Sequence, residues 1–208
     1  KSTLLKLFTR MIDTPDACLY IDGHDVNDYP LSQLRQQVSQ VLQDSFLFGE
    51  PLFTNISYDD PERSLELIWD AAESASLRGS IDEFPMKMQT IVGERGVMLS
   101  GGQKQRATLA RGLIRNAPVL ILDDCFSSVD TETEEHILSR LKRLRSGKTT
   151  ILVSHRISTL RHSDRIVVLE EGEIVEIGSH EELLALDGAY AQLERAQTLT
   201  DESVAVQG

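Results

Sequence analysis

Runs of apolar residues that end abruptly in polar residues constrain the fold of this chain more than any other feature of its sequence. The runs 119–122, 149–153 and 166–169 are continuous rather than alternating. Strands with this pattern are buried on both faces, which is typical of parallel sheets. Segments with helical spacing, such as 133–144, separate the runs. We therefore predict an α/β fold, with a mainly parallel sheet and helices on both of its faces.

Weaker signals complete the expected order of elements. Apolar residues of the segment 64–77 fall on one helical face, which comprises Leu67, Ile68, Ala71, Ala72 and Ala75. On the helix that follows Gly102, Arg106 and Arg111 are predicted to form a solvated or ion-paired face. The other predicted elements are a helix over 4–11, strands over 18–21 and 38–42, a hairpin over 170–178, closing helices over 181–186 and 189–196, and a frayed tail over 198–208.

Composition excludes several classes of protein. Hydrophobic residues make up 40% and charged residues 26% of the chain, a balance typical of folded globular proteins. Its 33 acidic and 21 basic residues give a net charge of −12, which repels phosphate backbones, so we expect no nucleic-acid partner. No apolar run approaches the roughly 20 residues of a membrane span. Cys18 and Cys125 fit no metal-ligand spacing and are predicted to be reduced core thiols.

Two aspartates end the most apolar run and are the first candidates for chemistry. Asp123 and Asp124 follow 119–122, and ligands of open parallel sheets bind beyond the carboxyl ends of the strands. The Walker B carboxylate of P-loop ATPases, which holds Mg²⁺, occupies such a position. On these residues alone, an ordinary acidic turn is an equally good interpretation.

The first three residues of the chain favour the Walker B interpretation over an ordinary acidic turn. Lys1, Ser2 and Thr3 run directly into a helical pattern, as do the last residues of a Walker A motif, whose lysine reaches the phosphates and whose hydroxyl binds Mg²⁺. The chain opens without an initiator methionine. We therefore expect a piece of a longer polypeptide that begins inside Walker A.

A serine–glycine–glycine turn within 99–103, LSGGQ, opens a second helix. Such a turn presents backbone N–H groups at the positive end of the helix dipole and can bind an anion. A serine cap with a flexible glycine entry is the plainer interpretation. However, Asp123, the segment 127–130 (SSVD) and His155 follow in order. This order resembles the signature, Walker B motif, D-loop and switch histidine of the ATP-binding cassette family, and the resemblance spans almost the whole chain.

This resemblance implies a fold, a ligand and a set of site residues. The fold would be a P-loop NTPase, with a RecA-like core over 1–44 and 115–208 and an inserted helical subdomain over 45–114. ATP with Mg²⁺ would be bound. Gln43, at the Q-loop position, would serve catalysis together with Asp124 and His155. The metal ligands would be Ser2, Gln43 and Asp123, and the nucleotide contacts Lys1, Ser2, Thr3, Gln43, Ser100, Gly101, Gly102, Gln103 and Asp130.

The same resemblance points to an exporter. Residues 90–96 look like the X-loop of exporters, and 162–184 resemble the C-terminal pattern of their cassettes. The chain would then be a soluble domain at the cytoplasmic face of a membrane, bound to the coupling helices of a transmembrane domain. Two cassettes would hydrolyse ATP at their interface, each site pairing the Walker motifs of one with the signature of the other. Phe46, Phe48 and Phe53 are interpreted as core or coupling-interface residues.

Asp124 departs from the family pattern, because homodimeric exporters carry glutamate after the Walker B aspartate. Aspartate is one methylene shorter, and a displacement of about 1 Å in a catalytic group can cost on the order of 100-fold in rate. The resemblance therefore implies the degenerate-site subunit of a heterodimeric exporter. Two alternatives remain: a non-transport ABC-type ATPase of DNA repair or chromosome maintenance, against which the X-loop and the acidic balance argue, and a binding-only nucleotide module.

Overall fold

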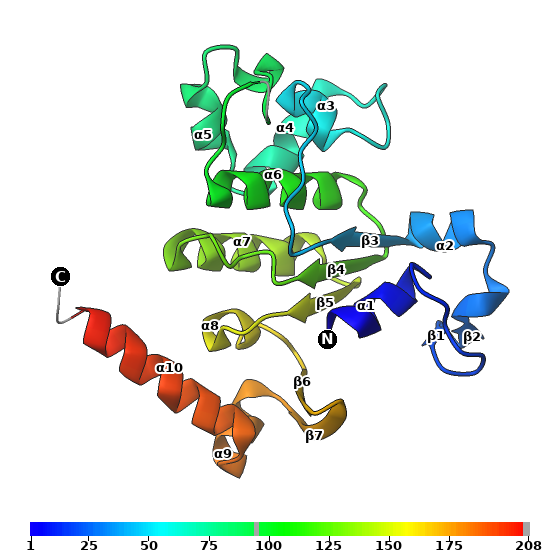
Figure 1. Ribbon diagram of the computed structural model, residues 1–208, viewed down its shortest axis with the longest axis vertical. Helices are drawn as coiled ribbons and strands as arrows, with labels where there is room; N and C mark the ends of the chain where they lie inside the picture. The colour runs from blue at the N-terminus through cyan, green and yellow to red at the C-terminus, as the bar shows by residue number, and fades with distance from the viewer. Residues whose placement is uncertain (94–95, 206–208) are drawn as a thin grey trace. The chain divides into compact units, whose positions relative to one another are not determined.

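The computed structural model describes residues 1–93 and 96–205, with side chains as far as Leu199. Contacts within the chain separate a first unit, Lys1–Ile151, from a second unit, Leu152–Gly208. The strands in Figure 1 are β1 (Tyr20–Ile21), β2 (His24–Asp25), β3 (Val38–Val41), β4 (Val119–Asp123), β5 (Thr149–Val153), β6 (Ile166–Glu170) and β7 (Glu173–Gly178). The helices are α1 (Ser2–Phe8), α2 (Leu31–Gln37), α3 (Leu52–Ile56), α4 (Leu65–Ser74), α5 (Arg78–Glu83), α6 (Gly101–Ile114), α7 (Thr131–Leu144), α8 (Ile157–Leu160), α9 (His180–Leu186) and α10 (Ala189–Ala205), with short 3-10 turns at Val26–Asp28 and Lys87–Gln89.

The sheet that organises the fold has the strand order β3–β4–β5. β3 and β4 are parallel, and their register sets Val41 opposite Leu122. Leu120 and Ile121 are completely buried although their side chains leave opposite faces of β4. A strand buried on both faces is what the continuous apolar run predicts, and the expected α/β class with parallel pairing is confirmed.

Helix α4 buries the face that its apolar spacing predicts, with one exception. Ile68, Ala71 and Ala72 are buried, and Ser64 caps the helix by accepting a hydrogen bond from the Leu67 backbone N–H. The Leu67 side chain is 51% exposed, so its assignment to the buried face is wrong. Leu67 lies about 100° round the helix from Ile68 and therefore falls outside the stripe that α6 covers.

Helix α6 approaches β3 very closely at a glycine. A Cβ atom on Gly112 would overlap the Val41 side chain. At the same place the Ser39 hydroxyl donates a hydrogen bond of 2.8 Å to the Gly112 carbonyl. A larger residue at 112 would push the helix away from the strand, so this glycine fixes the distance between α6 and the sheet.

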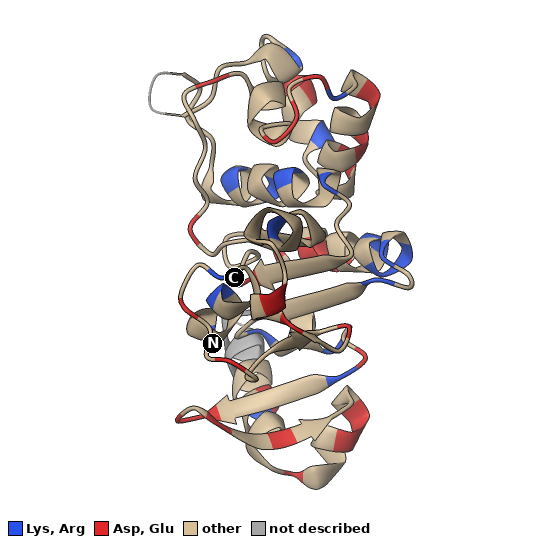
Figure 2. Ribbon diagram, turned by 90° about the vertical axis from the view of Figure 1, so that its right-hand side faces the viewer, with Lys and Arg blue, Asp and Glu red and all other residues tan. Residues whose placement is uncertain are grey.

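The second unit is built around the predicted hairpin. β6 and β7 pair antiparallel, and the turn residues Glu171 and Gly172 both have positive φ, of 50° and 90°, as tight hairpin turns require. Figure 2 shows acidic residues, drawn in red, at this turn. Ile166 on β6 packs with Ile157, Leu183 and Tyr190 in the core of this unit.

Three local expectations are corrected by the structure. The predicted strand over 18–21 is reduced to Tyr20–Ile21. Cys125 is a buried free thiol, whose pKa burial raises, whereas Cys18 is exposed and is not a core residue. The segment predicted to fray continues α10 as far as Ala205, while residues 206–208 lie outside the described residues.

Polar contacts explain why α10 extends past its predicted end. The Gln197 side chain accepts a hydrogen bond of 2.9 Å from the Ile157 backbone N–H and donates one to the His155 carbonyl. The Thr198 hydroxyl donates to the Glu194 carbonyl at 3.1 Å, one turn earlier. The spacing of apolar residues does not reveal either contact, so the helix predicted from that spacing ends too early. Along 1–93 and 96–205, no helix combines the length and the apolar character needed to cross a bilayer.

Candidate functional site

The ends of β3 and β4 bring two predicted site residues together. Because Val41 lies opposite Leu122, the residues that follow these parallel strands meet at the same edge of the sheet. The Gln43 side-chain N–H donates a hydrogen bond of 3.3 Å to an Asp124 carboxylate oxygen. Asp123, the last residue of β4, is only 5% exposed. An amide and two carboxylates thus gather where ligands of parallel sheets bind.

The backbone turns sharply at Asp124. Its φ is +46°, in the left-handed region that aspartate adopts more easily than most residues other than glycine. Asp123 before it and Cys125 after it are both buried, as is Phe126. Anchored on both sides, the turn leaves the Asp124 side chain partly open to solvent.

The residues that resemble the end of Walker A begin helix α1. Lys1 occupies the N-cap position without a side-chain capping bond, and Ser2 and Thr3 begin the first turn. α1 contacts β4, and its Leu5 side chain is buried. The hydroxyl-bearing turn therefore belongs to a helix that packs against the strand carrying the two aspartates.

The turn over residues 100–103, which we call the signature turn, is held by a capping box at the start of α6. The Ser100 hydroxyl oxygen accepts a hydrogen bond of 3.2 Å from the Gln103 backbone N–H. The Gln103 side chain in return accepts one of 2.9 Å from the Ser100 backbone N–H. The serine hydroxyl still carries a proton that it can donate. Both the plain cap and the anion site predicted for this turn are therefore compatible with its geometry.

The segment 127–130, which we call the D-loop, connects β4 to α7. Asp130 caps α7 by accepting a hydrogen bond of 2.8 Å from the Thr133 backbone N–H. This bond lowers the pKa of the Asp130 carboxyl. Ser128 lies against the signature turn, since a Cβ atom on Gly102 would come within 2.7 Å of the Ser128 carbonyl oxygen. The two predicted nucleotide-contacting segments are therefore neighbours within one chain.

Sequence analysis missed Gln105, which joins these two segments. Its side chain is 5% exposed and makes hydrogen bonds of 2.8 Å to the Ser127 hydroxyl and to the Ser128 backbone N–H. A signal was present: residues 105, 108, 109 and 112 have helical spacing, and all four are buried on α6. A glutamine on such a face must find partners, because a buried amide without them is costly.

Arg106 and Arg111 are not a solvated face, and that prediction is wrong. The Arg111 guanidinium donates to the Asn55 carbonyl at 2.7 Å and to the Phe46 carbonyl at 3.0 Å. Arg106 donates to the Ser76 carbonyl at 3.0 Å. Partial burial lowers the pKa of both guanidinium groups. The two arginines instead satisfy backbone carbonyls of the segments around α6, which amphipathic patterns cannot reveal.

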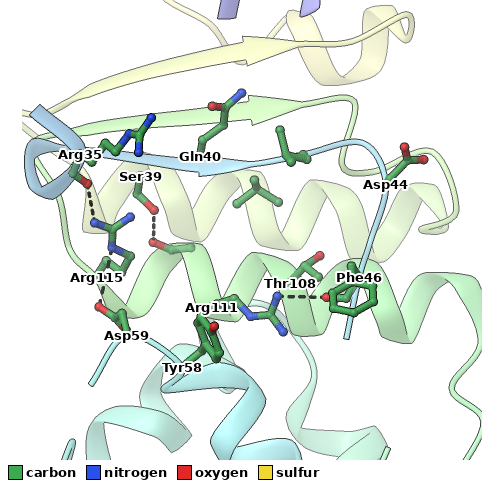
Figure 3. Close-up of a pocket in the computed structure, with 13 residues that line it drawn as sticks. Arg35, Ser39, Gln40, Asp44, Phe46, Tyr58, Asp59, Thr108, Arg111 and Arg115 are labelled. Carbon is green, nitrogen blue, oxygen red and sulfur yellow. Dashed lines mark hydrogen bonds and ion pairs between the residues drawn. The ribbon is translucent and has the colours of Figure 1, made fainter. Parts of the chain in front are cut away.

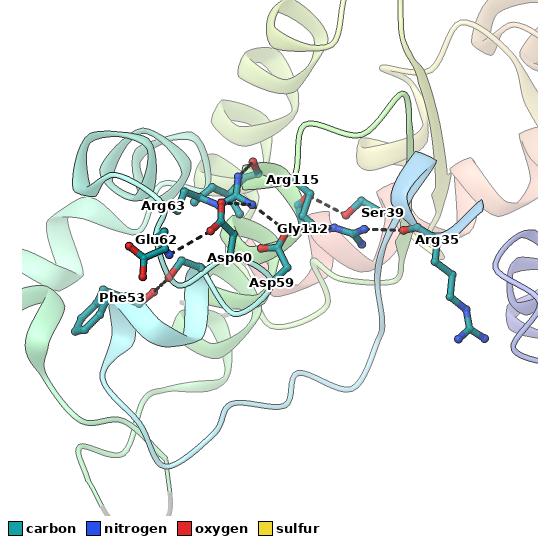
Figure 4. A network of polar contacts seen from close by, with 11 residues as sticks. Arg35, Ser39, Phe53, Asp59, Asp60, Glu62, Arg63, Gly112 and Arg115 are labelled. Carbon is teal, nitrogen blue, oxygen red and sulfur yellow. Dashed lines mark hydrogen bonds and ion pairs between the residues drawn. The ribbon is translucent and has the colours of Figure 1, made fainter. Parts of the chain in front are cut away.

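An ion-pair network holds the opposite end of α6 (Figure 4). Asp59 accepts from Arg63 at 2.9 Å and lies 3.7 Å from Arg115. Arg63 also donates to the Ile114 carbonyl at 3.0 Å, and Arg115 to the Arg35 carbonyl at 2.6 Å. α6 is therefore fixed at both ends, by the D-loop at one and by this network at the other.

The remaining predicted residues belong to other segments of the chain. His155 follows β5 and belongs to the second unit, where its carbonyl accepts from Gln197. In the segment 90–96, Val92 pairs with Val97 in a bridge, while Glu94 and Arg95 lie outside the described residues.

Comparison with known proteins assigns the chain to a family. A family model described as ABC transporter matches residues 1–127, more than half of the chain. The chain belongs to the ABC transporter family. ATP with Mg²⁺ is the ligand of ATP-binding domains in this family, so the cofactors that the motifs imply are confirmed.

Similar proteins include a putative export protein and a flippase. The chain is 46% identical over 199 residues to a putative multidrug export ATP-binding/permease protein of Bacillus subtilis, covering 96% of this chain and 34% of that protein. It is also 46% identical over 198 residues to an ATP-dependent lipid A-core flippase of Vibrio cholerae, covering 95% of this chain and 34% of the flippase. The chain thus spans about a third of the length of these relatives.

A solved structure of an ABC exporter agrees with the fold. It is a bacterial Atm1-family ABC exporter with ATP bound, 41% identical to this chain. The match has a TM-score of 0.90 and covers 95% of this chain and 35% of the exporter. The predicted P-loop NTPase fold is therefore confirmed.

The donors at the end of β4 fit Mg²⁺ bound to ATP. Among the described side chains, those of residues 1–93 and 96–199, no three His, Cys, Asp or Glu residues cluster as a metal site. Mg²⁺ does not require such a cage, since it is commonly held by one or two carboxylates with substrate phosphates and water. The carboxylates of Asp123 and Asp124 and the amide oxygen of Gln43 are hard donors of the kind that it prefers.

Proposed function

We propose that this chain is the nucleotide-binding domain of an ABC exporter, which hydrolyses Mg-ATP to drive transport across a membrane. The observation that carries the proposal is the hydrogen bond from Gln43 to Asp124 beside buried Asp123. It joins the ends of two parallel strands into one polar site at the edge where the family binds nucleotide. Two similar proteins, a putative export protein and a lipid A-core flippase, agree with this direction.

Each site residue has a role that its chemistry supports. Asp123 and the Ser2 hydroxyl would hold the metal ion, with Gln43 as a further oxygen donor, and bound Mg²⁺ would neutralise phosphate charge. Lys1 and Thr3 would contact the phosphates at the start of α1. Asp124 would accept a proton from the attacking water, with His155 sensing the γ-phosphate.

The second half of each site would come from a partner cassette. Ser100, Gly101, Gly102 and Gln103 would bind the nucleotide held by that partner, and Asp130 would contact it too. We further propose that the partner is a different chain and that the shorter Asp124 carboxylate makes this chain's own site slow. The signature turn is intact and preorganised, as a subunit that serves its partner's site requires.

A pocket beside α6 supports a transmembrane partner (Figure 3). It has a volume of about 470 Å³ and lies between β3 and α6, with Phe46 and Tyr58 at its rim. These two aromatic side chains are 63% and 60% exposed. We propose that a coupling helix of the transmembrane domain docks here, where the core (1–44 and 115–208) meets the helical subdomain (45–114).

Phosphate release by the full-length protein that carries this domain tests the proposal. Asp123→Asn removes the metal-holding charge and should abolish Mg-ATP-dependent hydrolysis at this chain's own site, measured in a complex whose partner site is silenced by mutation. Asp82→Asn, at an exposed carboxylate on α5, is the matched control and should retain the wild-type rate. Nucleotide binding without turnover in every cassette combination would instead support a binding-only module. Stimulation of turnover by DNA would support a non-transport ATPase.

A further inference from the structure

Gln105 ties the signature turn to the D-loop with both ends of its amide. The side-chain N–H donates to the Ser127 hydroxyl and the side-chain oxygen accepts from the Ser128 backbone N–H, each at 2.8 Å. A side-chain amide carries its donor and its acceptor on separate atoms, so Gln105 can bond both partners at once. Since Gln105 is 5% exposed, water cannot replace these bonds cheaply.

Close packing adds to the hydrogen bonds. A Cβ atom on Gly101 would lie 3.2 Å from the Ser128 side chain, and one on Gly102 would lie 2.7 Å from the Ser128 carbonyl oxygen. The absence of side chains at both positions therefore lets the signature turn approach Ser128 of the D-loop closely. Two consecutive glycines and a buried glutamine thus all contribute to the contact between the signature turn and the D-loop.

The D-loop is fixed at its other end as well. The Val129 backbone N–H donates to the Phe126 carbonyl at 2.9 Å, and Asp130 caps α7. A displacement of the signature turn would thus reach α7 through Gln105, Ser128 and Asp130. Within the first unit these elements form one connected body.

We propose that Gln105 is a positioning residue that locks the signature turn and the D-loop of this chain into one unit. The inference rests on the proposed function, in which both segments face the nucleotide of the partner cassette. Gln105 touches no nucleotide itself and acts through Ser127 and Ser128. Its loss would misplace the transition-state contacts while leaving this chain's own nucleotide contacts in place. Turnover should therefore fall without a matching rise in KM.

The test replaces Gln105 with methionine, which keeps the volume and removes both hydrogen bonds, in the full-length transporter. We expect kcat for ATP hydrolysis to fall about tenfold, because two buried hydrogen bonds are lost, with KM within about twofold of wild type. Ser127→Ala should lower kcat by about threefold. The double variant should be no worse than Gln105→Met alone, since Ser127 acts through the same bond.

The control is Ser74→Ala, which removes a buried hydroxyl that bonds the Asp70 carbonyl at 2.7 Å on α4. It matches the loss of a buried hydrogen bond and should leave kcat at the wild-type value. If Gln105→Met changes kcat no more than Ser74→Ala at an equal unfolding temperature, the positioning role is wrong. Additive effects in the Gln105–Ser127 cycle also overturn it. Should Gln105→Met fail to fold, an unchanged kcat in Ser127→Ala has the same meaning.

Asp123→Asn, measured in the same transporter with the partner site silenced by mutation, separates this proposal from the proposed function. Hydrolysis lost in Asp123→Asn but retained in Gln105→Met leaves the ATPase function intact and removes only the positioning role. Hydrolysis retained at this chain's own site in Asp123→Asn contradicts the proposed function itself.

Discussion

The signature turn and the carboxyl ends of β3 and β4 are both predicted to contact nucleotide, yet they are held in opposite ways. The signature turn is fixed by a capping box, by buried Gln105 and by glycines in backbone contact with Ser128. The carboxyl ends are joined by a single exposed hydrogen bond of 3.3 Å between Gln43 and Asp124. The element proposed to serve a partner is thus built in advance, whereas the carboxylate proposed as the catalytic base is loosely held.

The difference has a physical basis. A buried amide that loses its partners costs about 1–3 kcal/mol, so the Gln105 contacts persist in the free chain. An exposed bond such as Gln43 to Asp124 exchanges readily with water and contributes little. Mg-ATP would therefore reorganise the carboxyl ends far more than the signature turn.

The largest expected effect comes from filling the space between the signature turn and the D-loop. Gly102→Ala would bring a Cβ atom to 2.7 Å from the Ser128 carbonyl oxygen, closer than such atoms approach, so the turn must move. A shift approaching 1 Å in a transition-state contact costs on the order of 100-fold in rate. We expect kcat of the full-length transporter to fall by about this factor.

Gly79→Ala is the matched control for that prediction. Gly79 lies in α5, and a Cβ atom added there would meet no other atom within 4 Å, so the same glycine-to-alanine change should leave kcat unchanged. Alanine there should even raise the unfolding temperature slightly, because it favours the helix. Equal kcat values for Gly102→Ala and Gly79→Ala would mean that the signature turn is not held more rigidly than the carboxyl ends of β3 and β4.

The loosely held end should tolerate substitution and even benefit from it. Asp124→Glu restores a methylene and extends the carboxylate toward a water near the γ-phosphate. We expect phosphate release at this chain's own site to rise about tenfold, a typical contribution of a better-placed base being at least that. The measurement uses a complex whose partner site is silenced. An unchanged rate with nucleotide still bound would show that the shorter side chain does not limit turnover.

The contrast between the two regions also explains what the sequence could predict. The ends of β3 and β4 follow from continuous apolar runs and parallel register, so Asp123 and Asp124 are found from local patterns, whereas Gln43 is found only through the resemblance to the ATP-binding cassette family. The lock on the signature turn depends on residue 105 meeting residues 127 and 128. Sequence spacing carries no information on such tertiary partners.

Other errors have the same origin. Arg106 and Arg111 have the spacing of a polar face, but each guanidinium donates hydrogen bonds to backbone carbonyls of neighbouring segments. The extension of α10 depends on Gln197 bonding to Ile157. Patterns of apolar residues thus locate elements and strand ends, whereas polar contacts between elements appear only in three dimensions.

A smaller effect is expected where α6 meets β3, at the end of the helix away from the signature turn. Gly112→Ala places a methyl group against Val41, and overpacking of this kind costs about 1–3 kcal/mol. Chemical denaturation of the chain measures it, with Gly79→Ala as control. Val41→Ala in addition should recover part of the loss, because it vacates the contested space. Additive losses in the double variant would show that α6 does not press on Val41.

The smallest effect concerns pH and the D-loop anchor. The Thr133 backbone N–H lowers the pKa of Asp130 in the folded chain, so this carboxylate stabilises the fold above its unfolded pKa of about 3.9. That stability is lost as pH falls through the lower folded pKa. Asp130→Asn still caps α7 but does not titrate, so its unfolding temperature should fall less than that of wild type between about pH 6 and about pH 3. Glu132→Gln removes a charge from the same helical turn without removing the cap, and it should follow the wild-type profile. Parallel profiles for wild type and Asp130→Asn would mean that the cap contributes nothing through its charge, and the D-loop would then depend on Gln105 for its position.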